Sequence, residues 1–314
     1  MSSTGASAGA EAPLRIIAGP TGAGKSALAM HLAGRFGARL ISADSRQVYR
    51  GFDIGTAKPT RDERARAHHD GIDVAEPTER WSAARFAQDA QGWLARTTTE
   101  GKPAIVVGGT GLWLRALVQP LAEEPEMDPA RRLALQEALK GMDTASLRAW
   151  VETLDPPRAH LGRAQLSRAA EVALLSGTRL SDWHAKGADA PRRAARWLIV
   201  DPAEQLHEWI ARRLDQMLAA GWPDEVRSLA RSVHAGAPAW NACGYETIRD
   251  LVEGRVSLTE AREAVLIATR QYAKRQRTWF RNQLKDEPHV LRLDPRDPRA
   301  VERAERWFEG KGES

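Results

Sequence analysis

Short apolar runs alternate along the chain with longer segments in which apolar residues recur at helical spacing. The runs are rich in Ile, Val and Leu, which is typical of strands buried on both faces of a sheet. Alternation of such runs with amphipathic helices predicts an α/β fold, with a parallel sheet flanked by helices. The strands are expected at residues 14–18, 39–43, 104–107, 197–200 and 290–293.

The hydrophobic pattern changes between the third and fourth runs, where residues 123–195 show helical spacing only. Helices are predicted there at 129–140, 144–154 and 165–176, and after the fourth run at 204–220, 224–233, 258–285 and 301–308. We therefore expect an all-helical domain inserted into the α/β core. The domain boundaries would be 1–12 for a disordered tail, 13–122 and 196–292 for the two parts of the core, 123–195 for the insertion, and 293–314 for a C-terminal helix and tail.

The first predicted strand runs directly into a phosphate-binding motif, G-x-x-x-x-G-K-[ST], and a predicted helix follows it. Glycines at 22 and 24 permit backbone angles and close approaches that a Cβ would forbid. Successive backbone amides can then converge on phosphate oxygens, Lys25 adds a positive charge, and Ser26 can hold Mg²⁺. The motif consists of Gly19, Pro20, Thr21, Gly22, Ala23, Gly24, Lys25 and Ser26.

The overall composition is that of an ordinary globular protein, but the basic residues are concentrated in one segment. The chain has 314 residues, 28% of them charged, and one cysteine, which fits a reducing cytoplasm and excludes an internal disulfide framework. No apolar run approaches the length of a membrane span, so no membrane partner is expected. The formal net charge is +5, whereas residues 270–285 alone hold six basic residues and no acidic one.

This basic segment has a helical arrangement that suits a nucleic acid. Arg270, Lys274, Arg277 and Arg281 are separated by four, three and four residues, which places them on one stripe about 60° wide. Tyr272 and Trp279 would lie opposite, available for the core. A solvated basic face is the alternative, although interspersed acidic residues would then be usual. We favour contacts to a phosphate backbone, with strongly salt-dependent binding.

Two further loops follow predicted strands and would reach the same edge of the sheet. The second strand ends in a segment that carries Asp44, and the third runs into Gly108-Gly109-Thr110-Gly111. An ATPase or kinase of the usual kind would place an acidic Mg²⁺ ligand after the third strand. The glycines there weaken that interpretation and favour a phosphate compound handled by Lys25, Ser26 and Asp44.

Several motifs together resemble the tRNA dimethylallyltransferase, or tRNA isopentenyltransferase, family. They extend from residue 14 to about 285 and read GPTGAGKSALA, ISADSRQVYRGFDIGTAKP, VVGGTGLWLRAL, QLSRAAEV, DQMLAAGWPDEVRSL, CGYETI and TRQYAKRQRTWFRN. The resemblance implies transfer of a dimethylallyl group from dimethylallyl diphosphate to the exocyclic amine of the adenosine 3′ to the tRNA anticodon, with Mg²⁺. The motif at 19–26 would hold the departing diphosphate, and the protein would be a cytoplasmic monomer.

The resemblance also implies roles for individual residues. Asp44 would be the general base, with Thr110 at the reaction centre and Lys25 and Arg213 on the diphosphate. Asp44 could instead be a Mg²⁺ ligand or a helix cap, and Thr110 a turn residue. The tRNA would be contacted by Asp44, Ser45, Arg46, Gln47, Thr110, Arg132, Gln165, Leu166, Ser167, Arg168, Asn241, Ala242, Cys243, Gly244, Tyr245, Glu246, Lys274, Arg275, Arg277 and Arg281.

Three tryptophans depart from the family pattern. Trp81 and Trp113 stand where tyrosine is usual, and Trp209 stands where an arginine is usual one turn before Arg213. Trp113 is expected beside the substrates, and the insertion, through Arg132 and Arg168, is expected to close on the anticodon arm. The alternative functions are an ATP-dependent small-molecule kinase and a nucleotide-gated RNA-binding module without transferase activity.

Overall fold

The computed structural model describes residues 12–121, 125–186 and 191–311. The chain forms two compact units, one made of Met1–Val118 with Arg193–Ser314 and the other of Gln119–Arg192. The second unit interrupts the first between α4 (Gly111–Val118) and β5 (Ala195–Val200). Ala195 opens this strand, so the insertion domain expected at 123–195 overlaps the sheet by one residue.

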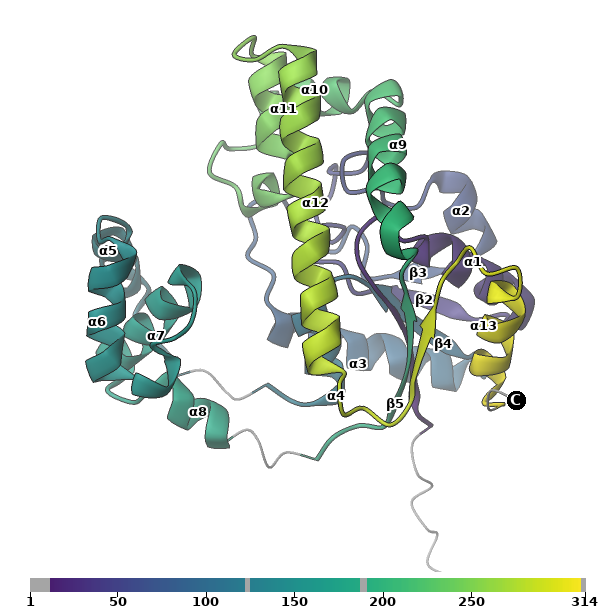
Figure 1. Ribbon diagram of the computed structural model, residues 1–314, viewed down its shortest axis with the longest axis horizontal. Helices are drawn as coiled ribbons and strands as arrows, with labels where there is room; N and C mark the ends of the chain where they lie inside the picture. The colour runs from purple at the N-terminus through teal and green to yellow at the C-terminus, as the bar shows by residue number, and fades with distance from the viewer. Residues whose placement is uncertain (1–11, 122–124, 187–190, 312–314) are drawn as a thin grey trace, which may run out of the picture. The chain divides into compact units, whose positions relative to one another are not determined.

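The larger unit is organised around a parallel sheet of six strands within the described residues, in the order β3-β2-β4-β1-β5-β6 (Figure 1). The predicted α/β fold with flanking helices and a helical insertion is confirmed. Five strands lie within two residues of their expected ends, and β3, which pairs with Leu40 and Ile41 of β2, was not predicted. The strands are β1 Leu14–Ala18, β2 Arg39–Ser42, β3 His69–Asp70, β4 Ala104–Gly108, β5 Ala195–Val200 and β6 Val290–Leu293.

Helices cover the sheet because its strands are apolar on both faces. Ile17, Leu40 and Leu198 are at most 1% exposed, which explains why these runs show no polar alternation. α9, α10, α11 and α12 contact one another in sequence. The helices of this unit are α1 Lys25–Phe36, α2 Arg61–Arg66, α3 Ala83–Thr99, α4 Gly111–Val118, α9 Leu206–Ala219, α10 Trp222–Ser232, α11 Tyr245–Val252, α12 Leu258–Gln283 and α13 Ala300–Glu309.

The smaller unit is helical and has its own core. Leu147, Val151 and Leu166 are fully buried there, at 0% exposed. Its first two helices begin at capping residues, since Asp128 accepts one backbone N–H and Asp143 accepts two. They are α5 Pro129–Lys140, α6 Thr144–Leu154, α7 Arg163–Ser176 and α8 Leu180–Lys186.

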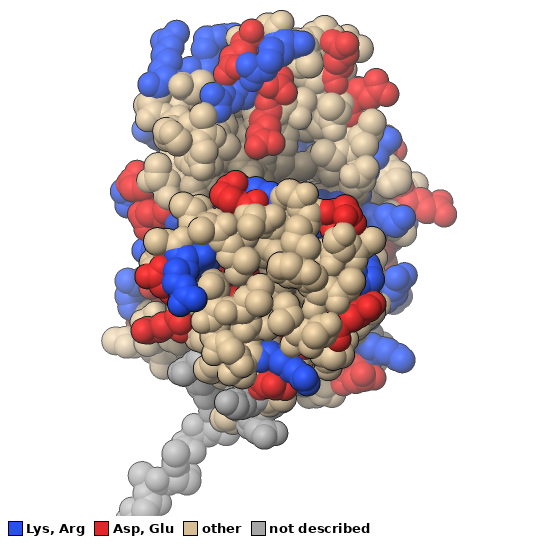
Figure 2. Space-filling view, turned by 90° about the vertical axis from the view of Figure 1, so that its left-hand side faces the viewer, with Lys and Arg blue, Asp and Glu red and all other residues tan. Residues whose placement is uncertain are grey.

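The surface is charged with both signs. On the face shown in Figure 2, Lys and Arg side chains are interspersed with Asp and Glu, and a broad area between them carries neither. Net charge alone therefore does not mark a binding surface on that face. None of the helices in the described ranges combines the length and the apolar character that crossing a bilayer requires.

Candidate active site

The phosphate-binding motif forms a loop between β1 and α1, at the carboxyl edge of the sheet. Gly22 and Gly24 have φ of +79° and +88°, the left-handed region that the sequence predicted for them. Gly24 precedes the first turn of α1, which has no acidic residue and no capping side chain. The first amides of α1 are thus free of side-chain acceptors and, with the helix dipole, favour an anion.

Two cations stand at this loop. Lys25 donates to the carbonyl oxygen of Pro20 at 2.7 Å, and Arg213 of α9 donates to Oγ1 of Thr21 at 3.1 Å. Burial and the nearby positive charge of Arg213 lower the pKa of Lys25 to about 8, although Asp44 and Asp201 oppose this shift. Burial also lowers the pKa of Arg213. Two partly desolvated cations held close together repel each other, so an anion bound between them would relieve the repulsion.

The segment after β2 meets the glycine loop after β4. The Ser45 N–H donates to Oγ1 of Thr110 at 3.1 Å, and the Thr110 N–H donates to the carbonyl oxygen of Ala43 at 3.3 Å. These bonds flank Asp44 on both sides in the sequence. Asp44 accepts the Arg46 N–H at 2.9 Å through Oδ1, which fixes its carboxylate in a local turn.

Gln276 of α12 joins the two glycine loops. Its Oε1 accepts the Thr21 N–H at 2.8 Å, and its Nε2 donates to the carbonyl oxygen of Gly109 at 2.9 Å. The side chain is 7% exposed, so both bonds are shielded from water. A Cβ at Gly109 would lie 2.4 Å from Nε2, which explains why glycine stands there. One buried amide therefore sets the spacing of the loops.

The loops line a cavity of about 580 Å³ that contains Lys25, Ser26, Asp44, Arg213 and Gln276 on its walls. A smaller space of about 80 Å³ shares Thr21, Gly22, Asp44, Arg213 and Tyr272 with this cavity and continues along apolar side chains. Its apolar lining includes Ile210, Leu214, Met217, Trp222, Ala242 and Val265, and Arg46, Thr56 and Thr269 also border it. A polar, cationic chamber thus adjoins an apolar one at Asp44.

The donors present fit Mg²⁺ only as a partly protein-bound ion. Ser26 supplies a hydroxyl and Asp44 a carboxylate to the same cavity, and both are oxygen ligands that Mg²⁺ accepts. Among the described residues no cluster of three or more His, Cys, Asp or Glu side chains could hold a metal. This combination suits an ion that keeps several waters and takes its other ligands from a bound phosphate compound.

Aromatic residues lie elsewhere than the sequence predicted. Trp113, expected beside the substrates, is 3% exposed and stacks on Phe86 with ring centroids 4.6 Å apart, so it belongs to the core. Tyr272, assigned to the core, instead lines both chambers. Burial and the charge of Asp44 raise the pKa of its phenol. Trp209 lines the larger cavity, beside the phosphate loop.

The expected basic stripe on α12 is broken at Arg277. Its Nε donates to Oδ2 of Asp201 at 2.8 Å, and the same guanidinium bonds the Ala203 carbonyl oxygen. Arg277 is therefore committed to an internal ion pair, which spacing alone could not reveal. Lys274, Arg275 and Arg281 are exposed and stay candidates for phosphate contacts.

Other residues expected at tRNA also have internal roles. In the insertion, Arg132 and Arg168 both pair with the buried carboxylate of Glu171, and Leu166 is fully buried. The expectation that Leu166 contacts tRNA is thus wrong for its side chain. Gln165 accepts the Gly162 N–H at 3.1 Å, and Ser167 is partly buried.

Of residues 241–246 and Gln47, also expected at tRNA, some are exposed and others make contacts inside the protein. Tyr245 is 0% exposed and donates to Oε1 of Glu225 at 2.6 Å, so its ring belongs to the core. Ala242 and Cys243 line the apolar chamber, whereas Asn241 and Glu246 are exposed and Gly244 is partly buried. Gln47 donates to the carbonyl oxygens of Thr56 and Ala57 and accepts from the Ser42 hydroxyl.

Replacing Gln276 by Leu tests the link between the loops. The Thr21 N–H and the Gly109 carbonyl would lose their buried partner, so we expect about tenfold weaker binding of inorganic diphosphate in calorimetric titration. Gln271→Leu, the same change at an exposed position of α12, is the control and should bind as the unsubstituted chain does. Equal affinity in the two variants would contradict the linking role.

The lowered pKa of Lys25 predicts a pH dependence of anion binding. Below pH 8 most Lys25 side chains are charged, and above it they lose the proton and the attraction to an anion. We therefore expect the Kd for inorganic diphosphate to rise as pH increases from 7.5 to 9.5. Lys25→Arg keeps its charge over this range, so its Kd should rise less. Parallel pH curves for the two proteins would refute the assignment.

Comparisons with known proteins identify the family of this chain. The profile of the IPP transferase family matches residues 47–283, and that of an isopentenyl transferase family matches residues 12–69. A tRNA dimethylallyltransferase of Sorangium cellulosum is 40% identical over 277 residues, covering 86% of this chain and 88% of that one. One of Gloeobacter violaceus is 39% identical, covering 94% and 98% of the two chains.

Solved structures give the same result. The full-length tRNA isopentenylpyrophosphate transferase of Bacillus halodurans superposes with a TM-score of 0.67 at 29% identity, over 96% of both chains. A eukaryotic dimethylallyltransferase acting on tRNA superposes with a TM-score of 0.77 at 25% identity, over 96% of this chain and 81% of the other. With a family match across most of its length, this chain belongs to the IPP transferase family.

Proposed function

We propose that this protein transfers a dimethylallyl group from dimethylallyl diphosphate to the exocyclic N6 amine of the adenosine 3′ to the anticodon in tRNA. One observation supports it above the rest: Asp44 lines both the cationic chamber and the apolar one. A molecule with a diphosphate head and a short hydrocarbon tail would occupy both chambers and present its reacting carbon near this carboxylate. The names of the relatives agree with this substrate pair.

The adenine amine needs a base because its lone pair is delocalised into the ring. As the new C–N bond forms, the Asp44 carboxylate accepts the amine proton. Its turn with Arg46 holds the acceptor in place, and the bonds between Thr110 and residues 43 and 45 fix that segment. The adenine must leave the anticodon stack to reach this position.

The leaving group is stabilised by fixed positive charge. The allylic C–O bond breaks with its electron pair on the diphosphate, whose growing charge meets the loop amides, Lys25 and Arg213. Both cations are hydrogen-bonded to the phosphate loop, Lys25 to Pro20 and Arg213 to Thr21, so little reorganisation is needed. Mg²⁺, held by Ser26 and the diphosphate, would neutralise further charge on the leaving group.

The geometry gives a kinase less support. β4 ends at Gly108 and continues into Gly109, without the acidic residue that holds Mg²⁺ in many nucleotide-cleaving enzymes. Asp201, the acidic residue after β5, is bound by Arg277. Neither strand beside β1 thus offers a free carboxylate at its end. We further propose that the donor is dimethylallyl diphosphate, that the reaction requires Mg²⁺, and that the protein is a cytoplasmic monomer.

Replacing Asp44 by Asn tests the proposal. The chain is incubated with tRNA, dimethylallyl diphosphate and Mg²⁺, and the tRNA nucleosides are analysed by mass spectrometry. We expect a dimethylallyl adenosine with the unsubstituted chain and a loss of at least about 100-fold in rate with Asp44→Asn. Filter binding should show that the variant retains tRNA. ADP formation from ATP without tRNA, and no modified nucleoside, would favour a kinase instead.

Salt dependence tests which residues of α12 contact tRNA. Changing Lys274 and Arg281 to Gln removes two exposed cations and should reduce the slope of log K against log salt by about 2. Arg277→Gln breaks an internal ion pair, so the slope should stay as in the unsubstituted chain. Equal loss of slope in the two proteins would contradict this division.

A further inference from the structure

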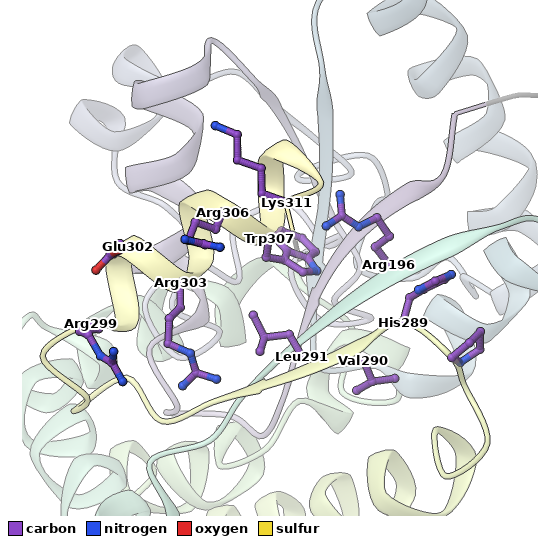
Figure 3. A pocket seen from close by; sticks show the side chains of 11 residues that line it. Arg196, His289, Val290, Leu291, Arg299, Glu302, Arg303, Arg306, Trp307 and Lys311 are labelled. Atoms are coloured by element: carbon purple, nitrogen blue, oxygen red, sulfur yellow. The ribbon is translucent and has the colours of Figure 1, made fainter. Parts of the chain in front are cut away.

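A second basic cavity lies between α13, β5 and β6, apart from the active site (Figure 3). Its volume is about 680 Å³, and its lining has one acidic residue, Glu302. The basic residues of the lining are Arg196, His289, Arg299, Arg303, Arg306 and Lys311. We call this cavity the α13 groove. The proposed transfer reaction assigns no role to these basic residues.

The floor of the groove is distant from the phosphate loop. Arg196 stands beside Arg15 in the register of β5 and β1, near the amino ends of both strands. The phosphate loop begins at Gly19, four residues further along β1, which corresponds to about 13 Å of strand. The floor of the groove at Arg196 and the phosphate loop therefore lie at opposite ends of β1, and one phosphate group cannot contact both.

Packing holds in place Arg196, at the floor of the groove, and its neighbour Arg15 on β1, which is not part of the lining. Nε of Arg15 donates to the carbonyl oxygen of Phe308 at 3.0 Å, and its guanidinium lies 4.6 Å from the centre of the Phe308 ring. The Arg196 guanidinium lies 5.9 Å from the centre of the Trp307 ring. Burial lowers the pKa of both arginines, and for Arg15 the charge of Arg196 adds to the effect. Two like charges are thus kept adjacent in partly dry surroundings.

The wall of the groove presents a row of arginines. Arg299 directly precedes α13, and Arg303 and Arg306 lie on it; the spacing of four and three residues aligns them along one side over about 10 Å. In Figure 3, Arg299, Arg303 and Arg306 lie to one side of Trp307, and Arg196 lies to its other side. Some charge is offset at the rim, where Arg303 pairs with Asp297 at 3.3 Å and Lys311 with Glu309 at 2.9 Å. Arg299 acts on the same carboxylate, since its backbone N–H and the charges of Arg299 and Arg303 lower the pKa of Asp297.

We propose that the α13 groove is an anion site that binds phosphate groups, with Arg196 at the floor and Arg299, Arg303 and Arg306 along the wall. The planar guanidinium fork matches two phosphate oxygens at once, and arginine is weakly hydrated, so a row of arginines favours phosphate over smaller anions. The length of the row suits more than one phosphate. Two sources have this chemistry, the backbone of an RNA and a soluble polyphosphate.

Hydrogen–deuterium exchange on the full chain tests the proposal and separates the sources. Peptides covering residues 286–311 should become protected when tRNA or inorganic tripolyphosphate is added. Protection by tRNA alone supports RNA as the source, and protection by tripolyphosphate, with or without tRNA, supports a soluble ligand. Absence of protection with both would overturn the proposal.

Variants show whether the arginines are responsible. Changing Arg196 and Arg299 to Gln should raise the midpoint of protection about tenfold or more, with the fold checked by thermal melting. Changing Arg61 and Arg231 to Gln, two exposed arginines outside the groove, should leave the midpoint unchanged. A similar loss in both pairs would contradict the site.

A last control separates the anion site from the proposed prenyl transfer. Only the choice of tRNA as the source of phosphate rests on that proposed function. Asp44→Asn should leave protection of residues 286–311 unaltered, because Asp44 is not part of the lining of the groove. If no dimethylallyl adenosine forms yet tripolyphosphate still protects this segment, the transfer proposal fails and the anion site stands.

Discussion

Burial of Lys25 next to the positive charge of Arg213 is the constraint on which the site depends. The fold holds a lysine and an arginine side by side at the start of α1, partly removed from water, so that the pKa of Lys25 falls to about 8. Such an arrangement costs stability in the free protein and is relieved when an anion binds. The charge is therefore positioned for a ligand, and the surrounding fold must hold it there.

Gln276 shows how the fold does this. A single buried amide bonds the phosphate loop on one side and the glycine loop after β4 on the other. The same glycine loop contacts the segment of Asp44 through Thr110. The cations, the carboxylate and the two chambers are thus positioned by one connected set of hydrogen bonds. A change far along the sequence, in α12, can therefore alter the geometry of a loop near the amino terminus.

How much the sequence could predict follows from the range of the interactions. The phosphate loop and the strands were predictable because a local motif and local apolar runs determine them. Gln276 was not, since its partners lie 255 and 167 residues away and only packing brings them together. The ion pair of Arg277 was not predictable either, because helical spacing locates a charge but does not reveal Asp201 opposite it. β3 was not predicted because a strand of two residues, His69–Asp70, is too short to show an alternation of apolar and polar positions.

Aromatic residues illustrate the same limit. Trp113 and Tyr272 are both compatible with a helix face near a ligand, and the sequence offers no means to decide which is buried. In the structure Trp113 stacks on Phe86 in the core, whereas Tyr272 lines the two chambers. The signal that could have helped is the uncharged pair Tyr272 and Gln276, one turn apart in an otherwise basic stretch of α12.

The central claim, that the loop at 19–26 holds a departing diphosphate, is tested most directly by a crystal structure with an unreactive donor. Replacing the bridging oxygen of dimethylallyl diphosphate by sulfur would slow departure of the diphosphate. The account predicts the diphosphate on the loop amides between Lys25 and Arg213, with the hydrocarbon tail directed to Met217 and Trp222. A donor bound elsewhere, with ATP occupying the loop in a parallel soak, would contradict it.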